Sequence, residues 1–271
     1  MSIESALPDV QSESKHPARP EVLAGIDRVK IRIVLPDQRQ IPATLSVVAR
    51  VPRGSRGVHM SRLYRNLAPD GQAIRLTDLS ERTLEVARSQ ETSQLEVSLA
   101  WEDLLERTAP MTGSAGFHPY RVQMRASWDP TGGVRLRTRL ESAAMLACPC
   151  SKALSGDLGF HNQRGILQAE VEGDQSSRLG SLVEILDQAA SNRVHPVLRR
   201  EDEKEVIDVL SRTDSFRFVE DAASRLLDLL EAAGHPAPSV HVRSLESIHA
   251  HDAVAWAGER GRELSEGVPV R

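Results

Sequence analysis

CPCSKALSGDLGFHNQR, residues 148–164, holds both cysteines of the 271-residue chain together with a lysine, a histidine and an arginine. A thiolate and an imidazole this close in sequence, Cys148 and His161, suit a pair of metal ligands or a nucleophile and its base. The alternative is a free buried cysteine beside a surface histidine. The flanking residues are polar and cationic and do not resemble a core segment, which favours a functional site.

The composition is that of an ordinary globular protein, with 40% hydrophobic and 27% charged residues. A net charge of -4 and an aromatic content of 3% predict no nucleic-acid partner. No apolar run approaches the ~20 residues that a membrane span needs, so no membrane association is expected. The amino terminus lacks an apolar signal core, and two cysteines make no disulfide framework. A cytoplasmic protein is therefore expected.

The first half of the chain predicts two strands, two helices and two further strands. Residues 27–35 alternate apolar and basic side chains, which is typical of a half-buried strand, and the next strand completes a hairpin. Ser80 is the expected N-cap of the second helix. The six elements are expected at 27–35, 41–51, 59–67, 79–89, 95–101 and 120–128.

The second half repeats that element order without repeating the sequence. The clearest helix is 218–234, whose apolar stripe ends at Gly234. A strand is expected at 239–247, after which the chain returns through HAHDAVAW. The other elements are expected at 134–146, 166–173, 181–193 and 201–210.

The chain resembles the prokaryotic type IB GTP cyclohydrolases across nearly its whole length and in the expected order. The motifs with the strongest resemblance are CPCSK, HNQRG, the run from Glu184 to Val206, FVEDA and ESIHAHDA. Four earlier stretches fit the same family: LPDVQ at 7–11, RGVHMSRL at 56–63, VSLAWEDLLERTAP at 97–110 and GFHPY at 116–120.

The resemblance implies an α+β tunnelling fold with two fused ββααββ modules, whose antiparallel sheets form barrels by oligomerisation. We expect a flexible arm at 1–20, a first module at 21–130 and a second module at 131–271 that carries most candidate site residues. The boundary lies near Asp129–Gly133. A homo-oligomer, and specifically a tetramer, is expected.

The resemblance also implies one divalent metal per site. Cys148 and His161 are the expected ligands, and a glutamate of the charged run at 201–205 completes the set. Counting through the motif selects Glu203, with Glu201 as the second choice, although such a run is ordinarily an exposed helix face. Zinc, iron(II) and manganese all accept such a set. Cys150 is expected on the substrate side or as a packed residue, since alternate residues of an extended chain point the same way.

Several residues are expected to contact substrate. Glu220 matches the carboxylate that accepts hydrogen bonds from a purine or pterin edge; alternatively, it stabilises the first turn of its helix. His249 and His251 are expected on one face of a strand as proton donors, or as a solvent-exposed pair. The expected phosphate contacts are Lys152 and Arg164, and the further candidates are His59, Ser61, Arg62 and Arg193.

Together these groups predict hydrolytic opening of the imidazole ring of GTP. The product implied by the resemblance is 7,8-dihydroneopterin triphosphate, formed with formate as the first step of folate and pterin synthesis. Two alternatives stay open. One is a deazaguanine nitrile reductase with a cysteine nucleophile and NADPH, and the other is a non-catalytic purine- or metal-binding protein.

Overall fold

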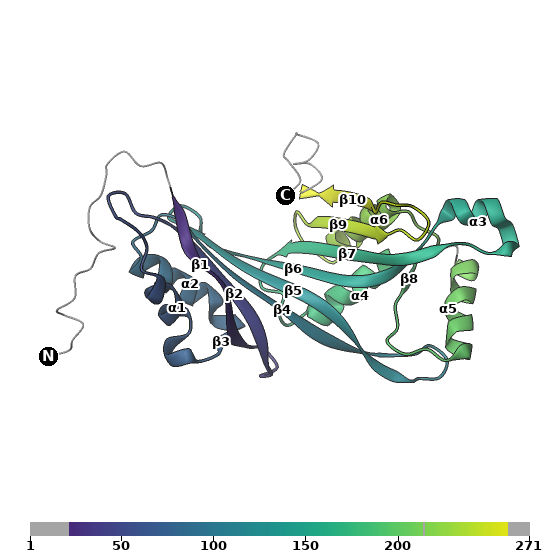
Figure 1. Ribbon diagram of the computed structural model, residues 1–271, viewed down its shortest axis with the longest axis horizontal. Coiled ribbons are helices and arrows are strands. Elements are labelled where there is room, and N and C mark those ends of the chain that lie inside the picture. The colour runs from purple at the N-terminus through teal and green to yellow at the C-terminus, as the bar shows by residue number, and fades with distance from the viewer. Residues whose placement is uncertain (1–21, 214, 260–271) are drawn as a thin grey trace. The chain divides into compact units, whose positions relative to one another are not determined.

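The computed structural model describes residues 22–213 and 215–259 (Figure 1). The predicted arm and its LPDVQ motif therefore lie outside the described residues. The chain divides into two compact units. Among the described residues, the first comprises those up to Trp101 with Gln123–Arg137, and the second comprises Glu102–Val122 with those from Thr138 onward. These divisions fall inside long strands, whereas the single boundary predicted near Asp129–Gly133 falls at a turn between two strands.

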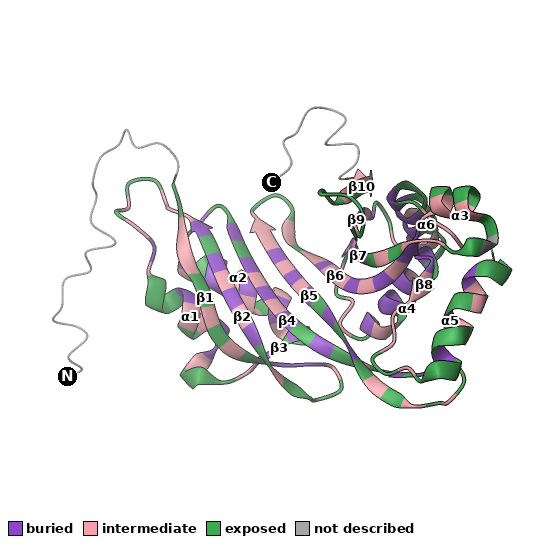
Figure 2. Ribbon diagram, turned by 45° about the vertical axis from the view of Figure 1, so that its right-hand side comes forward, coloured by how far each residue is buried: buried purple, intermediate pink, exposed green. Residues whose placement is uncertain are grey.

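The first unit is built on the predicted hairpin, formed by β1 (Leu23–Val34) and β2 (Gln40–Arg50). The strand β2 also pairs antiparallel with the first part of β4 (Leu95–Thr108), and the short β3 (Ile74–Arg75) pairs parallel with β1. Alternate residues of β2 and β4 are buried, as the banding in Figure 2 shows, whereas β1 buries only Ile33 and Val34 at its end. The period-two pattern in the sequence therefore places one face of β2 and of β4 against the core.

Two helices complete the first unit, α1 (Met60–Leu67) and α2 (Leu79–Ser89). Single 3-10 turns lie at Pro69–Gly71 and Leu76–Asp78. Because α2 follows directly on the second of these turns, its N-cap is Asp78. The prediction of Ser80 as N-cap is wrong, since Ser80 lies inside the first turn of the helix.

The second unit contains β6 (Gly133–Ala147) from Thr138 onward, together with the antiparallel strands β7 (Asn162–Glu172), β9 (Ser239–Leu245) and β10 (Ala253–Gly258). Its strand order is β10-β9-β7-β6-β5-β4, and β8 (Asn192–Arg193) pairs with β6. β5 (Ala115–Asp129) and β4 extend well beyond the predicted strands, so the expected loop between them is a short turn. These long strands contribute a segment to each unit.

The helices of the second unit are α3 (Pro149–Ser155), α4 (Leu179–Ala189), α5 (Arg200–Thr213) and α6 (Val219–Ala232). A 3-10 turn at Gly156–Leu158 follows α3. The helix α6 packs against β9, β10 and α4, and it buries Leu226 and Leu230 completely (Figure 1). Gly234 follows it with a φ of 83°, a left-handed conformation that favours glycine, which confirms the predicted stop.

The predicted α+β class and element order are confirmed. The first half has the order ββααββ, as expected of the tunnelling fold, with the two-residue β3 between its helices. The second half has the same order with α3, β8 and α5 added. None of the helices in the described ranges combines the length and the apolar character needed to cross a bilayer.

Candidate active site

A cavity of about 230 Å³ lies within the second unit, where the ends of several elements meet. It is lined from the end of β6, the start of β7, the start of α6 and the segment joining β9 to β10. The lining residues are Leu146, Cys148, His161, Gln163, Arg217, Phe218, Val219, Glu220, Ser244, Glu246, His249, His251 and Ala253. Five predicted site residues, separated by up to 103 positions, therefore share one cavity: Cys148, His161, Glu220, His249 and His251.

Local hydrogen bonds fix the positions of Cys148 and His161 relative to each other. Cys148 is the N-cap of α3 and donates its backbone N–H to the His161 carbonyl at 3.2 Å. The Ser151 hydroxyl donates to the Cys148 carbonyl at 3.1 Å and accepts the His161 backbone N–H at 3.1 Å. These three bonds tie the candidate thiol ligand to the candidate imidazole ligand.

The His161 ring is held by a second set of contacts. Its Nδ1 lies 3.1 Å from Oε1 of Gln163 and 3.5 Å from the hydroxyl of Ser247. Nε2 of Gln163 donates to Oε1 of Glu246 at 3.3 Å. The His161 imidazole, the Gln163 amide and the Glu246 carboxylate are thus connected by successive polar contacts at the cavity wall.

His249 and His251 both line the cavity, but they do not lie on a strand. The strand β9 ends at Leu245 and β10 begins at Ala253, so both histidines belong to the exposed connection between them. Their rings stack with centroids 5.3 Å apart and an interplanar angle of 16°. The predicted alternation along a strand is therefore wrong, although both imidazoles reach the same cavity.

Glu220 lies in the first turn of α6 with its side chain at the cavity. The backbone of that turn is capped by its neighbour, since the Asp221 carboxylate accepts the Phe218 backbone N–H at 2.9 Å. The alternative role of Glu220, a favourable interaction of an acid with the first turn of the helix, is compatible with this cap. The Glu220 side chain nevertheless lies at the cavity, where it can contact a ligand.

Cys150 and the two expected phosphate contacts do not line the cavity. Pro149 begins α3, so the chain is helical at Cys150 and the extended geometry assumed for the two thiols is wrong. Cys150 and Arg164 are exposed, while the Lys152 ammonium donates to the Gly156 carbonyl at 2.9 Å.

Glu203 and Glu201 are exposed on α5 and do not line the cavity. Their neighbour Asp202 is fully buried and fixes this orientation. Its carboxylate accepts the backbone N–H groups of Met111, Thr112 and Arg199 at 2.9 Å, and the Thr112 hydroxyl at 2.8 Å. Burial raises the pKa of Asp202, but these hydrogen bonds outweigh burial and lower it.

Three further predicted residues, His59, Ser61 and Arg62, belong to the first unit. His59 precedes α1, where its backbone N–H donates to Oε1 of Gln90 at 3.0 Å, and the other two are exposed on that helix. The cavity described above contains residues of the second unit alone.

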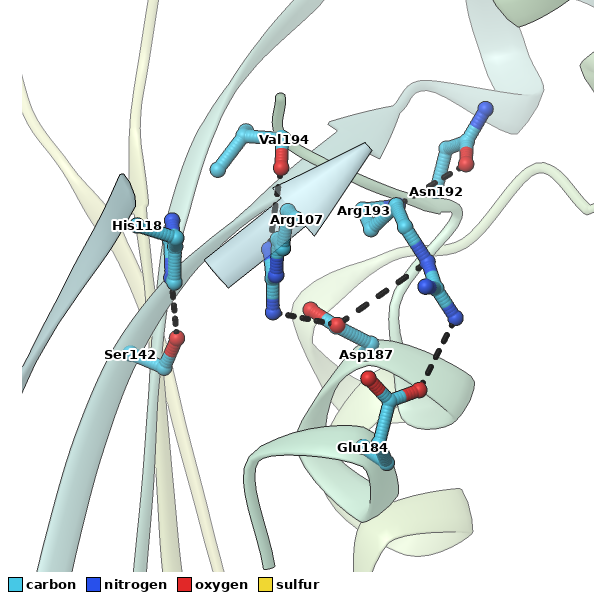
Figure 3. A network of polar contacts seen from close by, with 8 residues as sticks. All are labelled: Arg107, His118, Ser142, Glu184, Asp187, Asn192, Arg193 and Val194. Atoms are coloured by element: carbon cyan, nitrogen blue, oxygen red, sulfur yellow. Dashed lines mark hydrogen bonds and ion pairs between the residues drawn. The ribbon is translucent and has the colours of Figure 1, made fainter. Parts of the chain in front are cut away.

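Arg193 belongs to a polar network in the second unit that the sequence analysis did not identify (Figure 3). Its guanidinium lies 3.0 Å from Glu184 and 4.0 Å from Asp187. The Asp187 carboxylate forms a buried ion pair with Arg107 at 2.5 Å, and Arg107 also donates to the Val194 carbonyl at 2.9 Å. Burial raises the pKa of Asp187 to about 6, although the adjacent guanidinium groups lower it.

His118 lies in the same region, with its Nε2 2.7 Å from the buried hydroxyl of Ser142 (Figure 3). Burial, followed by the positive charges of Arg107 and Arg164, lowers the pKa of His118 to about 4. The imidazole is therefore neutral at pH 7. Neither this pair nor the Arg107–Asp187 pair lines the cavity. The first joins β5 to β6, and the second joins β4 to α4.

Four polar cavity residues were missed by the sequence analysis: Gln163, Arg217, Ser244 and Glu246. Three of them lie in or directly beside motifs that were recognised, namely HNQRG, FVEDA and ESIHAHDA. The signal that identifies Gln163 and Glu246 is their mutual contact across 83 positions, which one sequence does not reveal.

The side chains at the cavity match two of the three positions of the expected metal set. A thiol and an imidazole, held side by side, suit zinc or iron(II). Within residues 22–213 and 215–259, however, no three Cys, His, Asp or Glu side chains gather closely enough to hold a metal ion. The third ligand is thus not brought to Cys148 and His161 in this structure.

Comparison with known proteins agrees with the family that the motifs indicate. The profile of the family described as "Type I GTP cyclohydrolase folE2" matches residues 7–255. An α+β fold with a cavity of thiol, imidazole and carboxylate groups, together with this match, defines a type I GTP cyclohydrolase.

The curated relatives narrow the assignment. The chain is 31% identical to GTP cyclohydrolase FolE2 of Oceanobacillus iheyensis over 85% of this chain and 80% of the relative. It is 28% identical to GTP cyclohydrolase FolE2 of Kosmotoga olearia over 94% of this chain and 99% of the relative. The chain belongs to the FolE2 family of GTP cyclohydrolases.

Among solved structures, the chain is similar to urate oxidase from Bacillus subtilis. The match covers 89% of this chain and 100% of the other, with 7% identity and a TM-score of 0.45. That score is too low to establish a shared fold.

Proposed function

We propose that this chain hydrolyses GTP to 7,8-dihydroneopterin triphosphate and formate, the first step of folate and pterin synthesis. Membership of the FolE2 family supports this reaction over nitrile reduction and over non-catalytic binding. The single observation that carries the proposal is the shared cavity of Cys148, His161, Glu220, His249 and His251.

Cys148 and His161 would hold one divalent metal per site, either zinc, iron(II) or manganese. Such a metal supplies activation of water at neutral pH. Glu203 remains the proposed third ligand, with Glu201 as the second choice. Since both are exposed on α5, the proposal requires α5 to shift or a second copy of the chain to supply the carboxylate.

The other cavity residues bind and orient the substrate. The Glu220 carboxylate accepts two hydrogen bonds from the ring N–H and the exocyclic amine of guanine, a pairing that discriminates against adenine. His249 and His251 donate the proton that allows the ring nitrogen to leave when water has added to the imidazole-ring carbon. A second hydrolysis releases formate, after which the ribose opens, rearranges and closes onto the two amines.

The triphosphate requires cationic partners at the mouth of the cavity. Lys152 and Arg164 are proposed for this role, and Arg217 is a cation that lines the cavity itself. His59, Ser61, Cys150 and Arg193 remain proposed substrate contacts, although Arg193 is already engaged by Glu184. We further propose that the protein is cytoplasmic and acts as a homotetramer.

The test is incubation of the full chain with GTP and each metal in turn. Oxidation of the products followed by fluorescence detection measures neopterin, and formate is measured in parallel. Chelation should abolish both products and added metal should restore them. If GTP binds but its imidazole ring is opened with none of the three metals, the proposal is contradicted.

A further inference from the structure

The contacts of the His161 ring determine which of its two nitrogens carries the proton. Gln163 lies between two groups of known chemistry, with Nε2 3.3 Å from the Glu246 carboxylate and Oε1 3.1 Å from Nδ1 of His161. A carboxylate accepts hydrogen bonds and has none to donate, so the amide nitrogen must face Glu246. The amide oxygen therefore faces His161, and an amide oxygen only accepts.

It follows that Nδ1 of His161 is the protonated nitrogen of the neutral ring. The alternative tautomer would set the lone pair of Nδ1 against the lone pairs of the amide oxygen at 3.1 Å. The Ser247 hydroxyl, at 3.5 Å from the same nitrogen, can donate or accept and does not alter this assignment. With its proton on Nδ1, the ring has an unprotonated Nε2 as its only nitrogen able to bind a metal.

We propose that Gln163 and Glu246 are positioning residues that prepare His161 as a metal ligand. Gln163 holds the proton on Nδ1 and fixes the ring plane, and Glu246 holds the amide of Gln163 in the orientation that this requires. Both residues line the same cavity as His161 and Cys148. This inference rests on the proposed metal-dependent function, but the tautomer is a property of the metal-free chain.

In many metal sites a carboxylate orients the metal-bound histidine, whereas here the amide of Gln163 contacts His161. The presence of Glu246 explains how an amide can perform this role. A glutamine can be turned over, so it fixes a tautomer only if a second group selects its orientation. Glu246, which arrives from the end of β9, is that second group. A carboxylate at position 163 would need no such selection, because both of its oxygens accept.

This difference provides a rescue experiment on the full chain. Gln163→Leu should weaken zinc binding by about 10- to 100-fold, as loss of such outer partners typically does. Glu246→Leu should also weaken it, because the amide is then free to turn. Adding Gln163→Glu to Glu246→Leu should restore zinc affinity to near the wild-type value. A merely structural role for Glu246 predicts no such rescue.

Zinc affinity is measured by competition with a chromophoric chelator, and cobalt(II) absorption reports whether the Cys148 thiolate is bound. The matched control is Gln168→Leu, which changes a glutamine of the same strand that does not line the cavity and should leave affinity unchanged. Nitrogen-15 NMR of the metal-free chain, with His161 assigned by its loss in His161→Asn, should show protonated Nδ1 in the wild type and a mixed tautomer in Gln163→Leu.

The inference is overturned by a wild-type His161 protonated on Nε2, or by a Gln163→Leu variant that binds zinc as tightly as the wild type. If the wild type binds neither zinc nor cobalt(II), the metal set of the proposed function is wrong and the positioning role is overturned with it. In that case a protonated Nδ1 in the metal-free chain would still show that the hydrogen-bond assignment is correct, which separates the two failures.

Discussion

At the scale of single residues, the two cysteines provide a matched pair for testing the metal site. Cys148 lines the cavity beside His161, whereas Cys150 is exposed on α3 and does not. Cys148→Ala should lose bound metal and activity while keeping the fold, because it removes a thiolate ligand. Cys150→Ala should retain the metal, because Cys150 does not line the cavity. Elemental analysis with circular dichroism checks this, and full metal occupancy in Cys148→Ala would refute its assignment as a ligand.

Glu220 offers a second test at this scale. Since Asp221 caps α6, replacing Glu220 should affect the cavity and leave helix stability nearly unchanged. Glu220→Gln should reduce kcat/KM for GTP by about 100-fold or more, because a charged acceptor is lost opposite two donors. Metal content should not change. Glu231→Gln, on the exposed face of the same helix, is the control, and normal kinetics in Glu220→Gln would show that it does not anchor the base.

The neutral His118 predicts an acid-sensitive contribution to stability. Its pKa is lowered to about 4 in the folded chain, against an ordinary value of 6.5, so the unfolded chain binds the proton more readily. Stability from His118 is therefore present above pH 6.5 and is lost as the pH falls toward 4, by on the order of 3 kcal/mol. Asp187 acts in the opposite sense, because its raised pKa favours the folded chain as the pH falls from 6 to 3.8.

His118→Gln isolates the first effect, since glutamine can still bond to Ser142 and does not titrate in this range. Its free energy of unfolding, measured by denaturant titration between pH 7 and pH 4, should fall less steeply than that of the wild type. Equal slopes in the two proteins would show that His118 is not the group responsible.

At the scale of elements, the contact between α5 and the β4–β5 turn depends on one carboxylate. Asp202 joins the first turn of α5 to Met111 and Thr112 through three hydrogen bonds. Asp202→Ala should lower the Tm by several degrees at pH 7, because it leaves these partly buried donors without their acceptor. Glu203→Ala, at an exposed neighbouring position, should not change the Tm of the metal-free chain.

The pH dependence of this contact has a definite sign. Because the pKa of Asp202 is lowered in the folded chain, its contribution is present above its ordinary value near 3.8 and is lost as the pH falls below it. The Tm difference between Asp202→Ala and the wild type should thus shrink in acid. Scanning calorimetry at several pH values measures it, and a difference that grows in acid would contradict the assignment.

The elements themselves show how far the sequence predicts the structure. Strands with alternating burial and the long helix α6 were predictable, because hydrophobic periodicity records which face is buried. The orientation of α5 was not, since it depends on Asp202 meeting a turn 90 positions away. The wrong prediction for His249 and His251 has a similar cause. Their spacing is that of two residues on one face of a strand, but their position depends on where β9 and β10 cease to pair.

At the scale of the whole molecule, the motifs predicted the family and five of the residues that line the cavity, while the third metal ligand stays a prediction. Cys148 and His161 are neighbours because a strand end and a helix start are joined by local hydrogen bonds, which one short motif encodes. Glu203 comes from a separate helix, and the described part of one chain does not bring it to them. Hydrophobic periodicity in one sequence cannot reveal a ligand that is supplied by a shift of α5 or by a second copy of the chain.

The edge strand β10 predicts that copies of the chain associate. Among the described residues β10 pairs with β9 on one side only, and its sequence AVAWAG carries no charge to prevent pairing with another chain. Closure by a symmetric neighbour satisfies such an edge, so sedimentation should show a species above the 29.8 kDa monomer, and a tetramer is expected.

Val254 is exposed on β10. Val254→Lys should dissociate the assembly and reduce activity, whereas Val254→Thr, which adds no charge, should preserve both. A fully active monomer at micromolar concentration would show that the edge needs no partner and that Glu203 cannot be supplied by a second copy.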